Sequence, residues 1–358
     1  MKEKEKQLFK ALCKFKDQFT DPSLITSATP AVLGHFFFNR MQGIAYDTLK
    51  RNGLLGKVNR EFRNSLEAAY HQNILKNESF RKCIVMLSKI LSPCNCKVAM
   101  LKGAYFCAHY PDGYRTSNDV DLLVLPENVT MLGNLLSSAG FQQGNVRNGE
   151  FIRATRQEII ESKMMRGETV PYIKEVNLPF MKFFEVDINF SLDYKNGNGD
   201  TLEDMLSKVS IKSEKELSIP SLDDADFFIH LCAHLYKEAT TLPWIEMHRD
   251  MTLYKYCDIY MLLSEMTDEQ VQRIFERATG LGMEKICAYA ILETMGLFDM
   301  NNQFAYGASY GALGDDPSFC LRVVSPKDKK TLLYQTADVS ERFFMESRAD
   351  DLQEVDQI

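Results

Sequence analysis

The chain has 358 residues, of which 45% are hydrophobic and 25% are charged, and these values indicate a globular protein with a sizeable core. The length predicts about two domains. The formal net charge of −7 disfavours a protein that neutralises the many phosphates of a long nucleic acid, and it favours a small-molecule or protein partner.

The nine cysteines are scattered and include no CxxC pair. The charged N-terminus lacks the apolar core of a signal peptide, and no apolar stretch approaches the roughly 18 residues of a membrane span. These features predict a cytoplasmic protein with reduced thiols and no membrane contact. The close pair Cys94-Asn95-Cys96 has no second Cys or His pair of matching spacing, so a loop is favoured there over a metal or redox site.

Residues 1–92 are expected to form an N-terminal helical region. Thr29-Pro30 predicts a helix start, and residues 31–50 have apolar positions at helical spacing. Residues 57–91 form a longer helical tract that Ser92-Pro93 ends.

Residues 93–195 differ, because short apolar runs alternate with helix-compatible stretches. The expected α+β fold is a small mixed or antiparallel sheet packed with helices on one face and flanked by N- and C-terminal helical regions. The expected strands are residues 98–101, 119–125, 169–176 and 183–192, and the expected helices are residues 104–110 and 127–139.

Residues 196–199 mark a linker to a C-terminal helical region over 200–300. The helices expected there are 223–239, 250–266, 268–280 and 283–297, with Asp250 as the N-cap of the second. Residues 301–325 are rich in Gly, Asn, Asp and Ser, so residues 301–358 are expected to form a loop-rich extension with an acidic tail.

Asp119 and Asp121 flank Val120 at the start of an expected strand, so both carboxylates should point to one face while Val120 enters the sheet. Two carboxylates this close repel each other, and divalent cations relieve the repulsion. Mg²⁺ prefers hard oxygen ligands, and two such ions can support an in-line phosphoryl transfer. The motif alone is common and is often a solvated strand end.

Two further features strengthen this interpretation. Asp187 lies on a later alternating strand, where it can complete a metal site and accept the proton of an attacking hydroxyl if the strands are neighbours. Gly103 joins a strand to a helix, so the backbone and the helix N-terminus can approach a phosphate, and Lys102 adds a positive charge.

A glycine turn, an Asp-x-Asp strand and a later acidic strand residue together resemble the polymerase-β nucleotidyltransferase superfamily. The string LKGAYFCAHYPDGYRTSNDVDLLVL, followed by EVDINFSL, is similar to a bacterial family of uncharacterised nucleotidyltransferases. The similarity covers about residues 30–270. It implies two Mg²⁺ ions, for which Mn²⁺ can substitute, bound by Asp119, Asp121 and Asp187, and transfer of a nucleoside monophosphate from an NTP with release of pyrophosphate.

The chain departs from the superfamily in the turn, where Gly103-Ala104 replaces the usual Gly-Ser or Gly-Gly. The phosphate contact of the serine must therefore come from elsewhere, and Lys102, Arg115 and Ser117 are the candidates. Arg115 has an equally good alternative role in a salt bridge to Asp119 or Asp112, and Ser117 can simply cap the turn.

His234 and Lys237 share a face of an expected helix and are candidates for contacts with the acceptor, although core packing is the commoner role for such residues. His230 and His234 have the i, i+4 spacing of some zinc helices but lack the expected glutamate.

The function expected from these residues is Mg²⁺-dependent nucleotidyl transfer to a small-molecule or protein acceptor. The alternatives are a non-catalytic nucleotide-binding module that regulates a partner, and a kinase-like transfer of the γ-phosphoryl group on the same fold.

Overall fold

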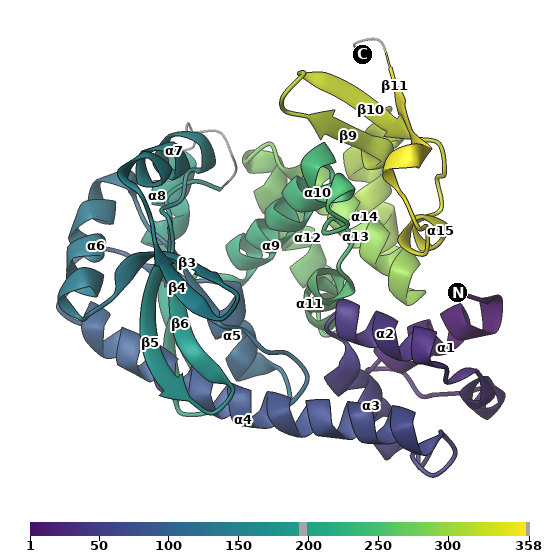
Figure 1. Cartoon of the computed structure of the whole chain (residues 1–358). Coiled ribbons are helices and arrows are strands. Elements are labelled where there is room, and N and C mark those ends of the chain that lie inside the picture. The colour runs from purple at the N-terminus through teal and green to yellow at the C-terminus, as the bar shows by residue number, and fades with distance from the viewer. Residues whose placement is uncertain (193–198, 356–358) are drawn as a thin grey trace. The chain divides into compact units, whose positions relative to one another are not determined.

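The computed structural model describes residues 1–192 and 199–355, and it has the α+β architecture that the sequence predicts (Figure 1). The chain divides into two compact units. The helical unit consists of Met1–Tyr70 and Phe228–Ile358, and the sheet unit consists of His71–Phe227. Among the described residues, no helix is long and apolar enough to cross a membrane.

The sheet unit holds the part of the chain in which the acidic motif lies. Its elements, starting with the helix that leads into it, are α4 (Arg60–Leu91), β1 (Ala99–Met100), α5 (Lys102–His109), β2 (Asp119–Leu123), η2 (Pro126–Asn128), α6 (Val129–Ser138), β3 (Gln142–Arg147), β4 (Glu150–Arg153), α7 (Arg156–Arg166), β5 (Tyr172–Leu178), β6 (Met181–Asn189), α8 (Gly199–Ser207), β7 (Ser210–Glu214) and β8 (Leu217–Ser221).

The helical unit combines the N-terminal helices with the C-terminal third of the chain. Its elements are α1 (Glu3–Cys13), η1 (Pro22–Ser27), α2 (Pro30–Phe38), α3 (Gln42–Arg51), α9 (Asp224–Ala239), α10 (Leu242–Glu246), α11 (Leu253–Leu263), α12 (Asp268–Gly280), α13 (Glu284–Phe298), α14 (Gln303–Leu313), η3 (Pro317–Leu321), β9 (Arg322–Ser325), β10 (Lys330–Tyr334), α15 (Val339–Phe343), η4 (Ala349–Asp351) and β11 (Leu352–Glu354).

The six-stranded sheet has the order β1-β2-β6-β5-β3-β4. Strands β2 and β6 run parallel, and the other neighbouring pairs are antiparallel. Alternate residues of β2 and β6 point to opposite faces. The apolar face packs against α4, α5 and α6 in one core that includes the fully buried Val120, Leu122, Val186 and Ile188. The opposite face is therefore the one that carries the acidic residues.

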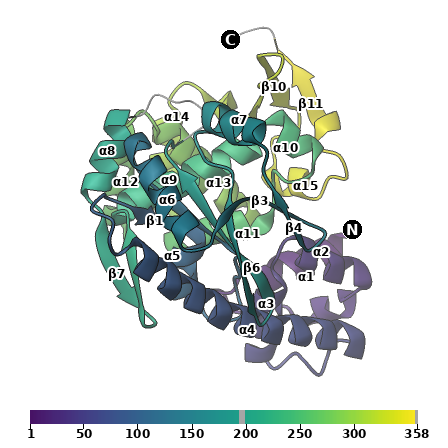
Figure 2. The same ribbon diagram turned by 60° about the vertical axis from the view of Figure 1, so that its left-hand side comes forward.

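Several elements of the sheet unit were not predicted. β3 is mostly polar and partly exposed, so it lacks the apolar alternation that marks a half-buried strand. The helix α7 lies between strands, where no helix was expected. The β7–β8 hairpin interrupts the expected helical region 200–300 and lies beside α5 (Figure 2).

Two other expectations also need correction. The single helix expected over 31–50 is two helices, because Arg40 has a positive φ of 57° between α2 and α3. The loop expected over 301–325 contains α14, which begins where the Asn302 side chain accepts a hydrogen bond from the Ala305 amide.

Asp250 is not the N-cap of α11; Thr252 holds that position, and Asp250 is fully buried in an ion pair with Arg348. Of the expected linker, residues 196–198 lie outside the described residues, and α8 begins at Gly199.

Candidate active site

Two carboxylates lie side by side along β2. Asp119 and Asp121 occupy alternate, half-buried positions of the strand, and Val120 and Leu122 between and after them are fully buried. The apolar residues anchor the strand in the core. Both carboxylates are therefore presented on the other face of the sheet, as the sequence predicts.

Asp187 lies on β6, directly beside β2. The parallel register pairs Asp121 with Asp187 and Asp119 with Glu185. Paired residues of neighbouring strands share a face of the sheet. Four carboxylates consequently stand together on this face.

Glu185 and Asn189 were not recognised as site residues from the sequence. They lie two positions before and after Asp187, so the same alternation that selects Asp187 selects them too. The Asn189 side-chain amide donates a hydrogen bond to Asp121 Oδ1 over 3.3 Å.

Burial and the neighbouring negative charges raise the pKa values of Asp187 and Glu185 on β6. Burial raises the pKa of Asp187 well above its usual value, and the negative charges of Asp121 and Asp119 raise it further. Burial and the charge of Asp119 also raise the pKa of Glu185. Positive charge at this face would relieve the repulsion.

The pKa of Asp119, by contrast, is lowered. Burial acts to raise its pKa, but a hydrogen bond from Ser117 and the charges of Lys102 and Arg115 outweigh that effect and lower it. Ser117 Oγ donates to Asp119 Oδ1 over 2.6 Å. Ser117 thus holds the Asp119 carboxylate in its ionised form.

Gly103 lies in the first turn of α5 and fits tightly against this strand. A Cβ atom at Gly103 would lie 2.8 Å from the Asp119 carbonyl oxygen and 2.8 Å from Ser117 Oγ. Only a residue without a side chain fits there. The same proximity places the Ser117 hydroxyl beside the turn that carries Gly103-Ala104.

Lys102 begins α5 with a positive φ of 31°, a backbone conformation that residues other than glycine rarely adopt. Its Nζ lies 3.4 Å from Asp121 Oδ2, and both side chains are largely buried. The structure therefore brings Lys102 to the acidic face of the sheet.

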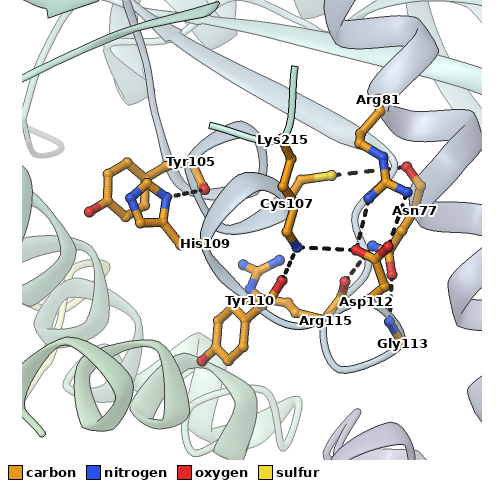
Figure 3. A network of polar contacts seen from close by, with 10 residues as sticks. All are labelled: Asn77, Arg81, Tyr105, Cys107, His109, Tyr110, Asp112, Gly113, Arg115 and Lys215. Carbon is orange, nitrogen blue, oxygen red and sulfur yellow. Dashed lines mark hydrogen bonds and ion pairs between the residues drawn. The ribbon is translucent and has the colours of Figure 1, made fainter. Parts of the chain in front are cut away.

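Arg115 lies in the loop between α5 and β2, together with Ser117. Its guanidinium carbon is 5.4 Å from the centre of the Phe106 ring. The ion pairs of Asp112 in the same loop are with Arg81 and Lys215 (Figure 3).

The residues of this face suit a divalent cation in their chemistry. Carboxylate oxygens are the ligands that Mg²⁺ prefers, and the pKa of Asp187, raised first by burial, is raised further by negative charge that a cation would offset. The Asp119 and Asp121 carboxylates are engaged instead by Ser117, Lys102 and Asn189. Within residues 1–192 and 199–355, no group of three or more His, Cys, Asp or Glu side chains is arranged to hold a metal ion.

His234 and Lys237, the predicted acceptor contacts, lie on α9 in the helical unit. His234 Nε2 is 3.4 Å from Glu238 Oε1, one turn along the same helix. Glu238 also forms an ion pair with Lys255.

The comparison with protein families gives one match, to a family described as "Uncharacterised nucleotidyltransferase", over residues 32–299. This range contains every residue of the acidic face and of the turn at Gly103. The comparison with curated proteins gives no match.

Proposed function

The chain belongs to this family of uncharacterised nucleotidyltransferases, and we propose that it transfers a nucleoside monophosphate from an NTP to a hydroxyl or phosphate group of a small molecule or protein, releasing pyrophosphate. The reaction would be of the polymerase-β type and would depend on Mg²⁺ or Mn²⁺.

One observation carries the proposal. The parallel register of β2 and β6 pairs Asp121 with Asp187 on the face of the sheet opposite the core, and Asp119 lies two residues before Asp121 on the same face. Carboxylates on one face support the proposal, because a nucleotidyl transfer needs cations that stabilise the attacking and leaving oxygens from one side.

The three aspartates would hold the cations. Asp119 and Asp121 would bind both ions, and Asp187 would complete one site and accept the proton of the attacking hydroxyl. When bound, the ions supply positive charge that stabilises the phosphates and the leaving pyrophosphate. Asn189, which already donates to Asp121, would keep that carboxylate oriented.

The turn at Gly103 would hold the triphosphate. The close packing of Gly103 on Asp119 brings the N-terminus of α5, whose backbone N–H groups can bind a phosphate, next to the acidic residues. Ser117 would supply the hydroxyl that Ala104 lacks. Lys102 and Arg115 would contact phosphate oxygens, which requires Lys102 to exchange its contact with Asp121 for the nucleotide.

The proposal is tested with purified protein, Mg²⁺, each labelled NTP and a panel of acceptors. We expect release of pyrophosphate and labelling of an acceptor. Asp121→Asn and Asp187→Asn should each reduce the rate at least about a hundredfold, because each removes a charge needed in the transition state. Glu175→Gln, which changes an exposed carboxylate on the neighbouring β5, serves as the matched control and should keep full activity.

Undiminished turnover in Asp121→Asn or Asp187→Asn would contradict the proposal. Formation of NDP without pyrophosphate would indicate a kinase-like phosphoryl transfer. NTP binding without turnover on any acceptor would instead favour a regulatory nucleotide-binding module.

A further inference from the structure

The loop between α5 and β2 carries two of the proposed triphosphate contacts, Arg115 and Ser117. It contains no regular structure that could fix its own backbone between His109 and Asp119. Side chains of another element, the helix α4, form several of its hydrogen bonds, and Figure 3 shows those of Asn77 and Arg81.

Asn77 of α4 bridges two points of this loop. Its Nδ2 donates to the Arg115 carbonyl oxygen over 2.7 Å, and its Oδ1 accepts from the Gly113 amide over 3.0 Å. The Asn77 side chain is only 3% exposed. A buried amide is costly unless it is hydrogen-bonded, and here both ends of the amide are used on the loop.

Residues in the neighbouring turns of α4 form hydrogen bonds with the same loop. Asn73 Nδ2 donates to the Gly113 carbonyl oxygen over 2.9 Å, and Arg81 binds both carboxylate oxygens of Asp112, at 2.8 and 3.2 Å. Asn73, Asn77 and Arg81 follow one another at intervals of four residues, so they share one face of the helix.

Gly113 allows the loop to take the shape that these contacts require. It is buried and has a φ of 89°, a conformation that residues with side chains rarely adopt. Lys215, from the tip of the β7–β8 hairpin, binds the loop on another side through the Tyr110 carbonyl oxygen and Asp112. The loop is thus held through its backbone at residues 110, 113 and 115.

We infer that Asn77 is a positioning residue for the nucleotide: by holding the Gly113 amide and the Arg115 carbonyl, it places the Arg115 guanidinium for contact with the triphosphate. The inference rests on the proposed function. It assigns to α4, a helix that packs against the apolar face of the sheet, an indirect part in the recognition of the NTP phosphates.

The test is a double-mutant cycle read out by calorimetric titration with non-hydrolysable NTP analogues and Mg²⁺. Asn77→Ala should weaken binding roughly tenfold, since displacement of a positioning contact is costly. In an Arg115→Ala background the same change should have almost no further effect, because Asn77 acts through Arg115. Asn77→Asp keeps the acceptor for Gly113 but lacks the donor for Arg115, and should weaken binding as well.

Ser79→Ala is the matched control. Ser79 is also buried on α4, and its hydroxyl donates to the Pro179 carbonyl oxygen, in a different loop of the same unit. Thermal unfolding of each variant reports the loss of stability, and Ser79→Ala should lose stability without losing affinity for the nucleotide.

Additive effects of Asn77→Ala and Arg115→Ala would overturn the inference, as would an equal loss of affinity in Ser79→Ala. Either result leaves the proposed function standing, because the wild-type protein still binds the NTP. Absence of NTP binding by the wild-type protein would overturn the proposed function and this inference together.

Discussion

Gly103 is the point at which the first turn of α5 packs directly on the strand of the candidate site. The space beside its Cα is filled by the Asp119 carbonyl and the Ser117 hydroxyl. A methyl group at this position must push the strand that carries Asp119 and Asp121 away from the turn that we propose holds the phosphates.

We therefore expect Gly103→Ala to lower the free energy of unfolding by about 1–3 kcal/mol, as overpacking does, and to abolish NTP binding. Chemical denaturation and calorimetric titration measure the two effects. Gly34→Ala is the matched control, because a Cβ at Gly34 in α2 meets no atom within 4 Å. This control should stabilise the protein by roughly 0.5–1 kcal/mol. If Gly103→Ala left both the free energy of unfolding and NTP binding unchanged, the close packing of the turn would not be required.

Asp112 gives a prediction for the pH dependence of stability. Burial acts to raise its pKa, but hydrogen bonds from Arg81 and Lys215 and their charges lower it below the ordinary value of 3.8. A carboxyl group whose pKa is lower in the folded state stabilises the fold above its unfolded-state pKa, and the contribution disappears as the pH falls through the folded-state value.

Asp112→Asn should consequently reduce the free energy of unfolding at pH 7, by at most about 1 kcal/mol because the group is partly solvated. The difference from the wild-type protein should shrink as the pH falls below 3.8. Urea denaturation across this pH range measures it. A difference that is the same at pH 7 and pH 3 would contradict the role given to the Asp112 carboxylate.

The acidic residues were predictable because they follow a local rule. Two-residue alternation places Asp119 and Asp121 on one face, and the same rule selects Glu185, Asp187 and Asn189 on β6. The hydrogen bonds that now engage these carboxylates were not predictable, because they depend on side chains from other elements. The roles of the three aspartates stay predictions, as do those of Arg115, His234 and Lys237.

At the scale of elements, the long amphipathic helices were predicted best. Helix α12 spans the expected residues, and its capping box of Thr267 and Gln270 is a local signal for its start. Exposed elements such as β7 were missed, because an exposed strand buries no alternating apolar face. Arg40 splits a helical pattern through its backbone conformation, which apolar spacing does not encode.

The C-terminal elements of the helical unit are fixed by buried ion pairs. Arg342 of α15 donates to both carboxylate oxygens of Glu293 on α13 at 2.8 Å, and the two side chains are 1% and 7% exposed. Arg348 and Asp250 form a second buried pair. Neither partnership is visible in the sequence, because the partners are 49 and 98 residues apart.

Removing one member of the first pair leaves a buried charge without its partner. We expect Arg342→Met and Glu293→Leu each to lower the free energy of unfolding by roughly 3–5 kcal/mol, and the double variant to lose less than either single one. Denaturant unfolding measures all three. Lys330→Met, which breaks an exposed pair with Glu354, should change stability very little. Additive losses in the double variant would contradict a coupled buried pair.

At the scale of the whole molecule, the helical unit unites segments from both ends of the chain. Asn39 accepts a hydrogen bond from the Leu253 amide, and Lys10 pairs with Asp299. Helical spacing identifies each segment but does not tell which segments pack together. The family match over residues 32–299 covers the whole sheet unit and residues 32–70 and 228–299 of the helical unit, so the family extends beyond the sheet.

The most direct test is a crystal structure of the protein with a non-hydrolysable NTP and Mn²⁺, whose anomalous scattering locates the ions. We expect two ions bound by oxygen atoms of Asp119, Asp121 and Asp187, with the triphosphate against the turn at Gly103. Ions bound elsewhere, or an Asp187 carboxylate that takes no part in binding them, would contradict it.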